Sequence, residues 1–157
     1  MPSLSHILSH PHPAPIFSDA QSAGIPRLGD TRLDGQHDEI HALVRSLRTA
    51  DPRSMLEAFD VLHAHVLDHF AMEEALMALN EFSSKECHIS EHAAVRQSFQ
   101  EVRAAIEAGR PGVAFRFAQQ LLDWLPEHAD ALDRHLVKLL FFQKTGGAAV
   151  LLHRLSS

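Results

Sequence analysis

Apolar residues recur in alternating steps of three and four along four long stretches of this sequence, and this spacing strongly limits how the chain can fold. Such a rhythm keeps one face of an α-helix turned toward its neighbours, because positions three and four apart lie about one turn away. The stretches begin near Leu33, Met55, His88 and Phe117. The pattern therefore predicts an all-α fold of four helices that bury their apolar faces against one another.

Five histidines and one glutamate interrupt these apolar faces. They are His37, His69, Glu73, His88, His92 and His128. Burying an unpaired polar group costs roughly 1 to 3 kcal/mol, and burying an isolated charge costs far more. A shared cation would satisfy all six residues together, so the pattern favours a metal site. The alternative is a set of core histidines that hydrogen-bond to one another, which would require six polar positions to coincide.

Length, charge and cysteine content exclude several classes of protein. At 157 residues, the chain suits one domain around a single core. The net charge is −6 and no basic cluster is present, so we expect no nucleic-acid partner. A single cysteine, Cys87, excludes an intrachain disulfide and favours the cytoplasm. We find no signal-peptide pattern and no apolar run of about 18 residues, so neither secretion nor a membrane span is expected.

The two ends of the chain differ in composition from the part between them. Residues 1–30 contain five prolines and three histidines, which favours an extended, poorly ordered N-terminal arm. Residues 31–145 carry the helical pattern and form the predicted bundle. Residues 146–157 are an apolar tail, for which we expect a short C-terminal helix.

Turn-forming residues mark the ends of the predicted helices. Asp51 followed by Pro52 favours an N-cap and a first helical position, and Ser83–Glu86 matches a capping box. Gly109–Gly112 breaks the chain. The expected helices run from about 31 to 49, from Asp51 to about 79, from Ser83 to the break, and from there to near Gly146. Short connections make neighbouring helices antiparallel, so the sequence predicts an up-down-up-down four-helix bundle.

In such a bundle, residues equidistant from a turn lie at similar heights. Counted from the middle of the third turn, His92 lies 18 residues before it and His128 lies 18 residues after it. His88, at 22 residues before the turn, is nearly level with Asp133, at 23 residues after it. Asp133 therefore joins the set, although a five-residue step from His128 turns it about 140° away on a regular α-helix. A bend at the proline before His128 favours Asp133 as a ligand.

The other two turns bring helices one and two to the same layer. Glu73 lies nine residues before Phe82, and His92 lies ten residues after it. His37 and His69 match less well about the first turn, with an offset of four residues, or about 6 Å. All four helices are nevertheless expected to supply polar residues to one layer.

The composition of this layer points to two metal ions. Five imidazoles and two carboxylates exceed what one tetrahedral zinc ion needs, and the thiolates of a structural zinc site are missing. These ligand types suit iron, manganese and zinc about equally. Three further histidines lie off the apolar faces: His41, His63 and His65. We expect them to be exposed to solvent, or to contact a metal-ligating side chain without binding the metal themselves.

Several motifs carry these residues: Asp34-Gly35-Gln36-His37, His69-Phe70-Ala71-Met72-Glu73-Glu74, Leu76-Met77, His88-Ile89-Ser90-Glu91-His92, and Trp124-Leu125-Pro126-Glu127-His128 followed by Asp133. From Asp34 to Asp133 the chain resembles the hemerythrin-like proteins, in particular the bacteriohemerythrins. The resemblance implies a non-haem di-iron centre with an oxo or hydroxo bridge. Its implied ligands are His88, His92 and His128 on one iron, His37 and His69 on the other, and Glu73 and Asp133 as bridges. Pro126, the long arm and the apolar tail depart from the family.

The resemblance further implies that dioxygen binds reversibly at an open position of the second iron, for storage, delivery or sensing. Its pocket would be lined by Trp124, Leu125, Phe70 and Met77, whose apolar side chains keep water and protons away. We therefore expect an oxygen-binding protein with no catalytic residues, served by a redox partner or an oxygen-consuming enzyme. The alternatives are a di-iron enzyme or repair protein that acts on peroxide or nitric oxide, and a structural metal-bound bundle.

Overall fold

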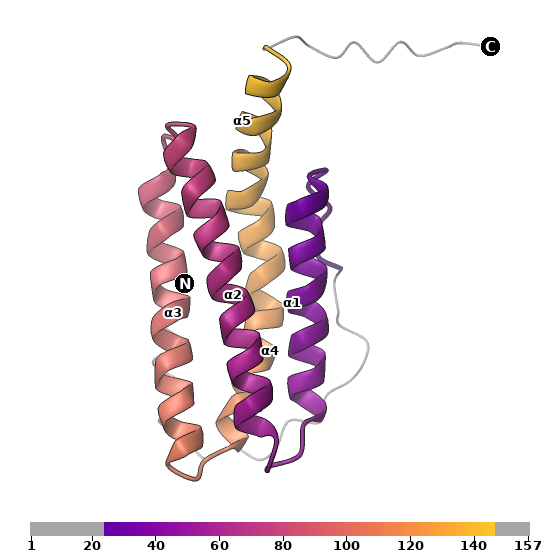
Figure 1. Ribbon diagram of the computed structural model, residues 1–157, viewed down its shortest axis with the longest axis vertical. Coiled ribbons are helices and arrows are strands. Elements are labelled where there is room, and N and C mark those ends of the chain that lie inside the picture. Colours follow the sequence, from indigo (N-terminus) through magenta and orange to yellow (C-terminus); the bar gives the residue numbers. More distant parts are fainter. Residues whose placement is uncertain (1–23, 147–157) are drawn as a thin grey trace, which may run out of the picture.

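The computed structural model describes residues 24–146, and these residues form an antiparallel four-helix bundle (Figure 1). The elements are α1 (Thr31–Thr49), α2 (Met55–Leu79), α3 (Lys85–Glu107), α4 (Gly112–His128), a π-helical segment η3 (Ala129–Asp133), and α5 (Arg134–Lys144). The last three follow one another without a break and together form the fourth helix of the bundle. The predicted all-α, up-down-up-down architecture is confirmed.

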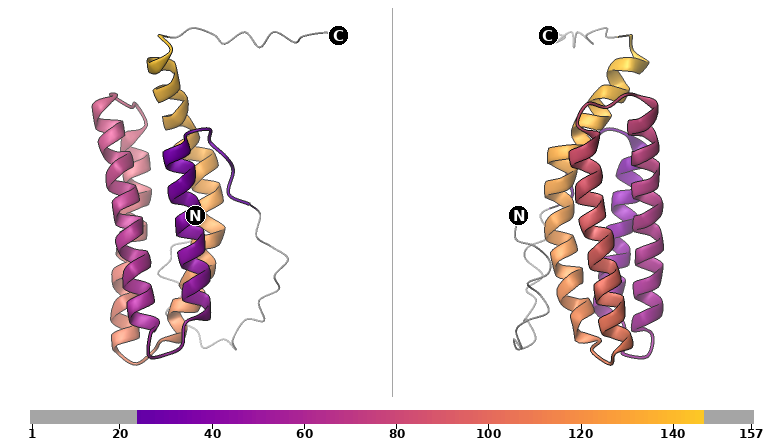
Figure 2. Two further views of the ribbon diagram at one scale, coloured as in Figure 1. Left: turned by 45° about the vertical axis from the view of Figure 1, so that its right-hand side comes forward. Right: turned by 90° about the vertical axis from the view of Figure 1, so that its left-hand side faces the viewer.

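The helices pack in a ring, in which α1 contacts α2 and α4, and α3 contacts α2 and α4. Figure 2 shows this arrangement from two further sides, with α5 extending beyond the end of the bundle. The larger apolar cluster of the core includes the parts of the helices near the α1–α2 and α3–α4 connections. There Phe59, Phe99 and Phe117 are fully buried, with ring centroids 4.7 to 5.8 Å apart. This aromatic cluster anchors one half of the bundle.

The first helix begins as its sequence predicts, but two predicted caps are wrong. The Asp30 carboxylate caps α1 by accepting from the backbone N–H groups of Arg32 and Leu33. Asp51, predicted as the N-cap of the second helix, instead closes a turn by accepting from backbone N–H groups at 53 and 54, and α2 starts only at Met55. The predicted capping box over 83–86 is not formed, because α3 starts after Ser84 with no side-chain cap.

The fourth helix is interrupted, whereas the sequence predicts one helix with a bend at Pro126. Pro126 lies inside α4, and the irregularity follows it as the five-residue segment η3. In the left view of Figure 2, α5 leans away from the line of α4. The predicted end near Gly146 is confirmed, since α5 stops at Lys144 and Gly146 has a φ of 62°, as expected just beyond a helix.

Parts of the predicted arm and tail lie outside the described residues, namely 1–23 and 147–157. The described end of the arm is tied to α1, because the Asp34 carboxylate accepts from the backbone N–H groups of Leu28 and Gly29. Within the range 24–146, no helix is long and apolar enough to cross a membrane.

Candidate metal centre

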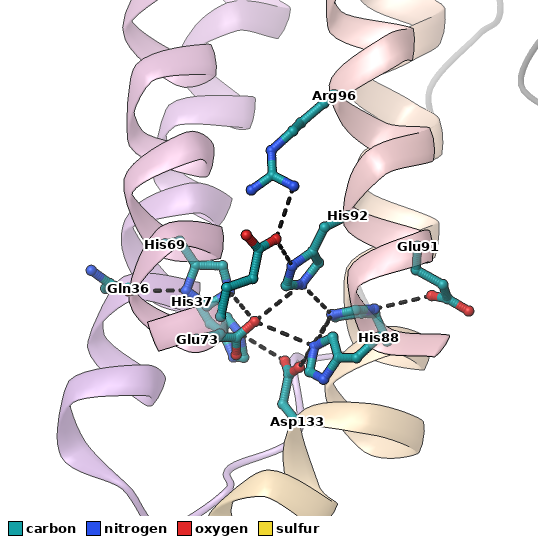
Figure 3. A network of polar contacts seen from close by, with 11 residues as sticks. Gln36, His37, His69, Glu73, His88, Glu91, His92, Arg96 and Asp133 are labelled. Carbon is teal, nitrogen blue, oxygen red and sulfur yellow. Dashed lines mark hydrogen bonds and ion pairs between the residues drawn. The ribbon is translucent and has the colours of Figure 1, made fainter. Parts of the chain in front are cut away.

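Seven polar side chains meet in a buried layer between the four helices, and Figure 3 shows side chains from this layer converging. Each is no more than 1% exposed. They are the seven residues that the sequence predicts as ligands: His37 from α1, His69 and Glu73 from α2, His88 and His92 from α3, His128 from α4 and Asp133 from η3. Within this layer the ligand atoms form two groups that share Glu73.

The three-histidine group consists of His88, His92 and His128, together with Glu73. The Nε2 atom of His128 lies 3.0 Å from Nε2 of His88 and 3.3 Å from Nε2 of His92. Three ring nitrogens therefore converge on one point. Three imidazole lone pairs directed at one point suit a divalent transition-metal cation.

The two-histidine group consists of His37 and His69, together with Glu73 and Asp133. The two imidazole rings meet edge to face with their centroids 4.9 Å apart. The offset that the sequence gives for these two histidines is therefore absorbed by the packing of α1 against α2. This group has one histidine fewer than its neighbour.

The two carboxylates lie between the groups and face both of them. Asp133 places Oδ1 3.0 Å from Nε2 of His88 and 3.1 Å from Nε2 of His128, while its Oδ2 lies 3.2 Å from Nε2 of His37. Glu73 places Oε2 3.2 Å from His92 and 3.7 Å from His69. Both carboxylates are thus positioned to bridge two cations.

The π-helical segment explains how Asp133 reaches the layer. On a regular α-helix, a residue five positions after His128 would face elsewhere. A π-helical turn closes i→i+5 hydrogen bonds and holds more residues than an α-helical turn, so positions five apart return to nearly the same face. Because η3 spans the five residues that end at Asp133, the carboxylate lies beside the His128 ring. Such π-helical turns occur frequently at functional sites.

Three ligand histidines contact an outer partner that the sequence analysis missed. The contacts join Nδ1 of His69 to Oε1 of Gln36 at 2.9 Å, Nδ1 of His92 to Oε1 of Glu74 at 3.0 Å, and Nδ1 of His128 to Oε2 of Glu91 at 3.0 Å. In each pair the partner comes from the preceding helix. Each partner also adjoins a buried polar residue in sequence, which is the signal that could have identified it. These contacts fix each ring so that Nε2 faces the layer.

Burial and charge shift the pKa values within the layer in opposite directions. Burial lowers the pKa of His69 to about 4. Burial also lowers the pKa of His128, but close contacts with the carboxylates of Asp133 and Glu91 outweigh it and raise the value to about 9. Burial raises the pKa of Glu73, but contacts with neighbouring histidines hold it at about 2, and Asp133 is lowered in the same way. Both carboxylates are therefore anionic at neutral pH.

Several buried ligand atoms have no hydrogen-bond partner among the described residues. They are both ring nitrogens of His37, Nε2 of His69, Nδ1 of His88, both oxygens of Glu73 and both oxygens of Asp133. Leaving so many polar atoms unsatisfied in an interior is costly, because each has lost its water. Cations between the two groups would satisfy all of those that face the layer. The two clusters of histidines and carboxylates are thus consistent with a binuclear metal site.

The predicted pocket residues do not all lie together. Phe70 stacks on His92 with centroids 3.8 Å apart, and Trp124 stacks on His128 at 4.3 Å. Leu125 is buried in the same apolar cluster as Phe70, and Trp124 packs against it. Met77 belongs to a second cluster, which lies on the other side of the polar layer along α2. The first three side chains therefore form an apolar cover on one side.

The three histidines off the apolar faces do not join either metal-ligand group. His63 stacks on Phe99 with ring centroids 4.5 Å apart. His65 lies with Nε2 3.5 Å from Oε2 of Glu39, and His41 is partly exposed. These three histidines are therefore close to ligand residues in sequence but lie outside the metal-ligand layer.

Comparison with known proteins agrees with this geometry. The chain is 31% identical over 113 residues to the bacteriohemerythrin of Ralstonia nicotianae, a match that covers 72% of this chain and 82% of the relative. It is 28% identical to the bacteriohemerythrin of Aquifex aeolicus, covering 69% of this chain and 88% of the relative. Residues 28–140 match the family model described as the hemerythrin HHE cation-binding domain, and the chain therefore belongs to the hemerythrin family.

Proposed function

We propose that this protein holds two iron ions in the buried layer and binds dioxygen reversibly there. The proposed ligands of one iron are His88, His92 and His128, and those of the other are His37 and His69. Glu73 and Asp133 would bridge the two, because their oxygens face both groups. When bound, a pair of irons supplies the two electrons that reversible dioxygen binding requires.

The unequal number of histidines is the observation that carries this proposal. One group offers three imidazoles and the other offers two, although Glu73 belongs to both groups. A metal with fewer protein ligands keeps a position for a small exogenous molecule. A purely structural site would instead be closed on both sides. The layer is thus suited to take up a diatomic ligand beside His37 and His69.

The surrounding residues favour binding over chemical conversion. Phe70, Trp124 and Leu125 cover the layer with apolar surface, which keeps water from a bound ligand. Glu73 and Asp133 have lowered pKa values, so neither carries a proton to donate at neutral pH. A ligand that is shielded from protons leaves in the form in which it arrived. The names of the two relatives, both bacteriohemerythrins, agree with this role.

The test is a cycle of reduction and air exposure. Purified protein would first be analysed for metal, with two irons per chain expected. It would then be reduced without oxygen, exposed to air and returned to an inert atmosphere while visible spectra are recorded. A visible band that appears in air and disappears under the inert gas over several cycles supports the oxygen carrier. A single irreversible oxidation would indicate an enzyme, and one zinc per chain would remove the basis of the proposal.

Reversible binding of this kind serves storage, delivery to an oxygen-consuming enzyme, or sensing. A redox partner that returns oxidised iron to the ferrous state would belong to the same proposal. The expected compartment is the cytoplasm.

A further inference from the structure

The outer partners of the ligand histidines differ in charge between the two groups. In the three-histidine group, Nδ1 of His92 and Nδ1 of His128 each face a carboxylate, from Glu74 and Glu91 respectively. In the two-histidine group, Nδ1 of His69 faces the neutral side-chain amide of Gln36. Each group also contains one histidine, His37 in the two-histidine group and His88 in the three-histidine group, whose Nδ1 has no hydrogen-bond partner among the described residues.

The Glu74 carboxylate is itself held in place by Arg96. Its Oε1 accepts a hydrogen bond of 2.8 Å from Nη1 of Arg96. The Arg96 guanidinium lies over the Phe70 ring, 5.3 Å from its centroid, and Phe70 stacks on His92. The His92 ring is therefore fixed both at its Nδ1 atom and on one face.

A carboxylate and an amide affect a metal-bound imidazole differently. When Nε2 binds a cation, Nδ1 keeps its hydrogen and donates it to the outer partner. A carboxylate acceptor withdraws positive charge from the ring more strongly than a neutral amide, because charge-assisted hydrogen bonds are the stronger kind. The ring nitrogen that faces the metal then becomes a better donor. Loss of such an outer partner typically weakens metal binding by about 10- to 100-fold.

We propose that Glu74 and Glu91 are positioning residues that make the three-histidine group the tighter cation site, so that this group fills first. Gln36, being neutral, leaves the two-histidine group as the weaker site, which fills second. This inference rests on the proposed function only in requiring that both groups bind a cation. It concerns the order in which the two groups bind cations and how tightly each does so. The number of histidines alone does not say which outer side chains set these affinities.

The experiment is a titration of the metal-free full-length chain with Co²⁺ under inert gas. Calorimetry and the visible bands of bound cobalt monitor the binding. The wild-type protein should bind two Co²⁺ ions in two unequal steps. Glu74→Gln should weaken the tighter step by about 10- to 100-fold and leave the weaker step unchanged. Glu91→Gln should act in the same way. Glu39→Gln is the matched control, because Glu39 faces His65 outside both groups, and it should change neither step.

A reverse substitution separates this role from general damage to the fold. Gln36→Glu places a carboxylate beside His69 and should tighten the weaker step, an improvement that a destabilised protein would not give. Equal binding steps in the wild type, or equal weakening of both steps by Glu74→Gln, would overturn the proposal and leave the metal centre intact. Failure of the wild type to bind Co²⁺ at all would overturn both this inference and the proposed centre.

Discussion

The two halves of the bundle interior are built differently. Near the α1–α2 and α3–α4 connections, the interior consists of apolar side chains around Phe59, Phe99 and Phe117. Farther along the same helices, seven buried histidines and carboxylates fill the space, and many of their atoms lack a hydrogen-bond partner. The apolar half packs side chains that need no polar partner, whereas the polar half contains buried atoms without a partner that a cation would satisfy. The fold and the metal centre should therefore respond to different substitutions.

The largest effect should follow from Phe99→Ala in the apolar half. The side chain is fully buried and contacts two other phenylalanine rings, so its removal leaves a cavity. We expect the free energy of unfolding to fall by about 3 to 5 kcal/mol. Urea unfolding of the metal-free protein measures this, and the iron content of the folded fraction should stay at the wild-type level. A loss of less than about 1 kcal/mol would contradict the assignment of stability to this half.

Glu73→Ala tests the polar half. This change removes a carboxylate that faces both histidine groups, so iron content should fall. The metal-loaded protein should then lose the stability that binding adds, roughly 4 kcal/mol if metal is present at about 1,000 times its dissociation constant. Elemental analysis and thermal unfolding with and without chelator check both effects.

His65→Ala is the control for Glu73→Ala, because His65 lies outside both metal-ligand groups. It should keep full iron and nearly wild-type stability. If both variants kept full iron, or if His65→Ala were the more damaging, burial in the layer would not be what identifies a ligand.

Leu125→Ala sharpens the comparison where the two halves meet. Leu125 is buried in the apolar cluster and lies three residues before His128, on the same side of α4. Its loss should admit water and protons, so the variant should take up oxygen but become irreversibly oxidised several-fold faster than wild type. Spectra recorded in air at matched pH give the rate. Leu121→Ala makes a similar cavity one turn before Leu125 and two turns before His128, and it should not change the oxidation rate. Equal rates in wild type and Leu125→Ala would mean that this side chain does not shield the site.

The smallest effect concerns His63, a titratable side chain that stacks on Phe99. Burial lowers the pKa of His63 below its ordinary value of 6.5. The nearby Asp60 carboxylate opposes this shift in part, and the Arg103 guanidinium adds to it. Below pH 6.5 the unfolded chain therefore takes up this proton more readily than the folded chain does. The contribution to stability is present above pH 6.5 and is lost as the pH falls through the folded pKa.

We accordingly expect His63→Gln to lose less stability than wild type between pH 7 and about pH 5. The measurement is urea unfolding of metal-free protein at several pH values. The readout is the difference in pH slope, because both proteins share every other titrating group. Parallel slopes would show that His63 titrates alike in the folded and unfolded chains.

The sequence predicts the helices well because their apolar spacing reflects burial directly. The first helix has the predicted range 31–49, and α2 ends at the predicted Leu79. The caps were less predictable, since Asp51 can close a turn as readily as it can start a helix. Propensity alone does not decide between these two uses of one carboxylate.

The metal-ligand layer could be predicted because buried histidines and carboxylates interrupt an apolar pattern. The π-helical segment could not be predicted, because no residue type marks it. A regular α-helix, which the sequence predicts there, conflicts with the spacing of Asp133 from His128. Gln36, Glu74 and Glu91 were missed because they lie at the edge of the buried layer, where a polar residue is ordinary. Their role depends on which helix lies beside them, and that is a property of the tertiary structure.

The outer partners also come before their histidines in the order of synthesis. Gln36, Glu74 and Glu91 precede the histidines that they contact by 33, 18 and 37 residues. As the chain leaves the ribosome, each supporting side chain is therefore made before the ring that it orients. His128 and Asp133 are the last of the seven to be made, and each group of the centre contains one of them. A nascent chain that ends before α4 has neither complete group, so cation capture by the whole site marks a finished bundle.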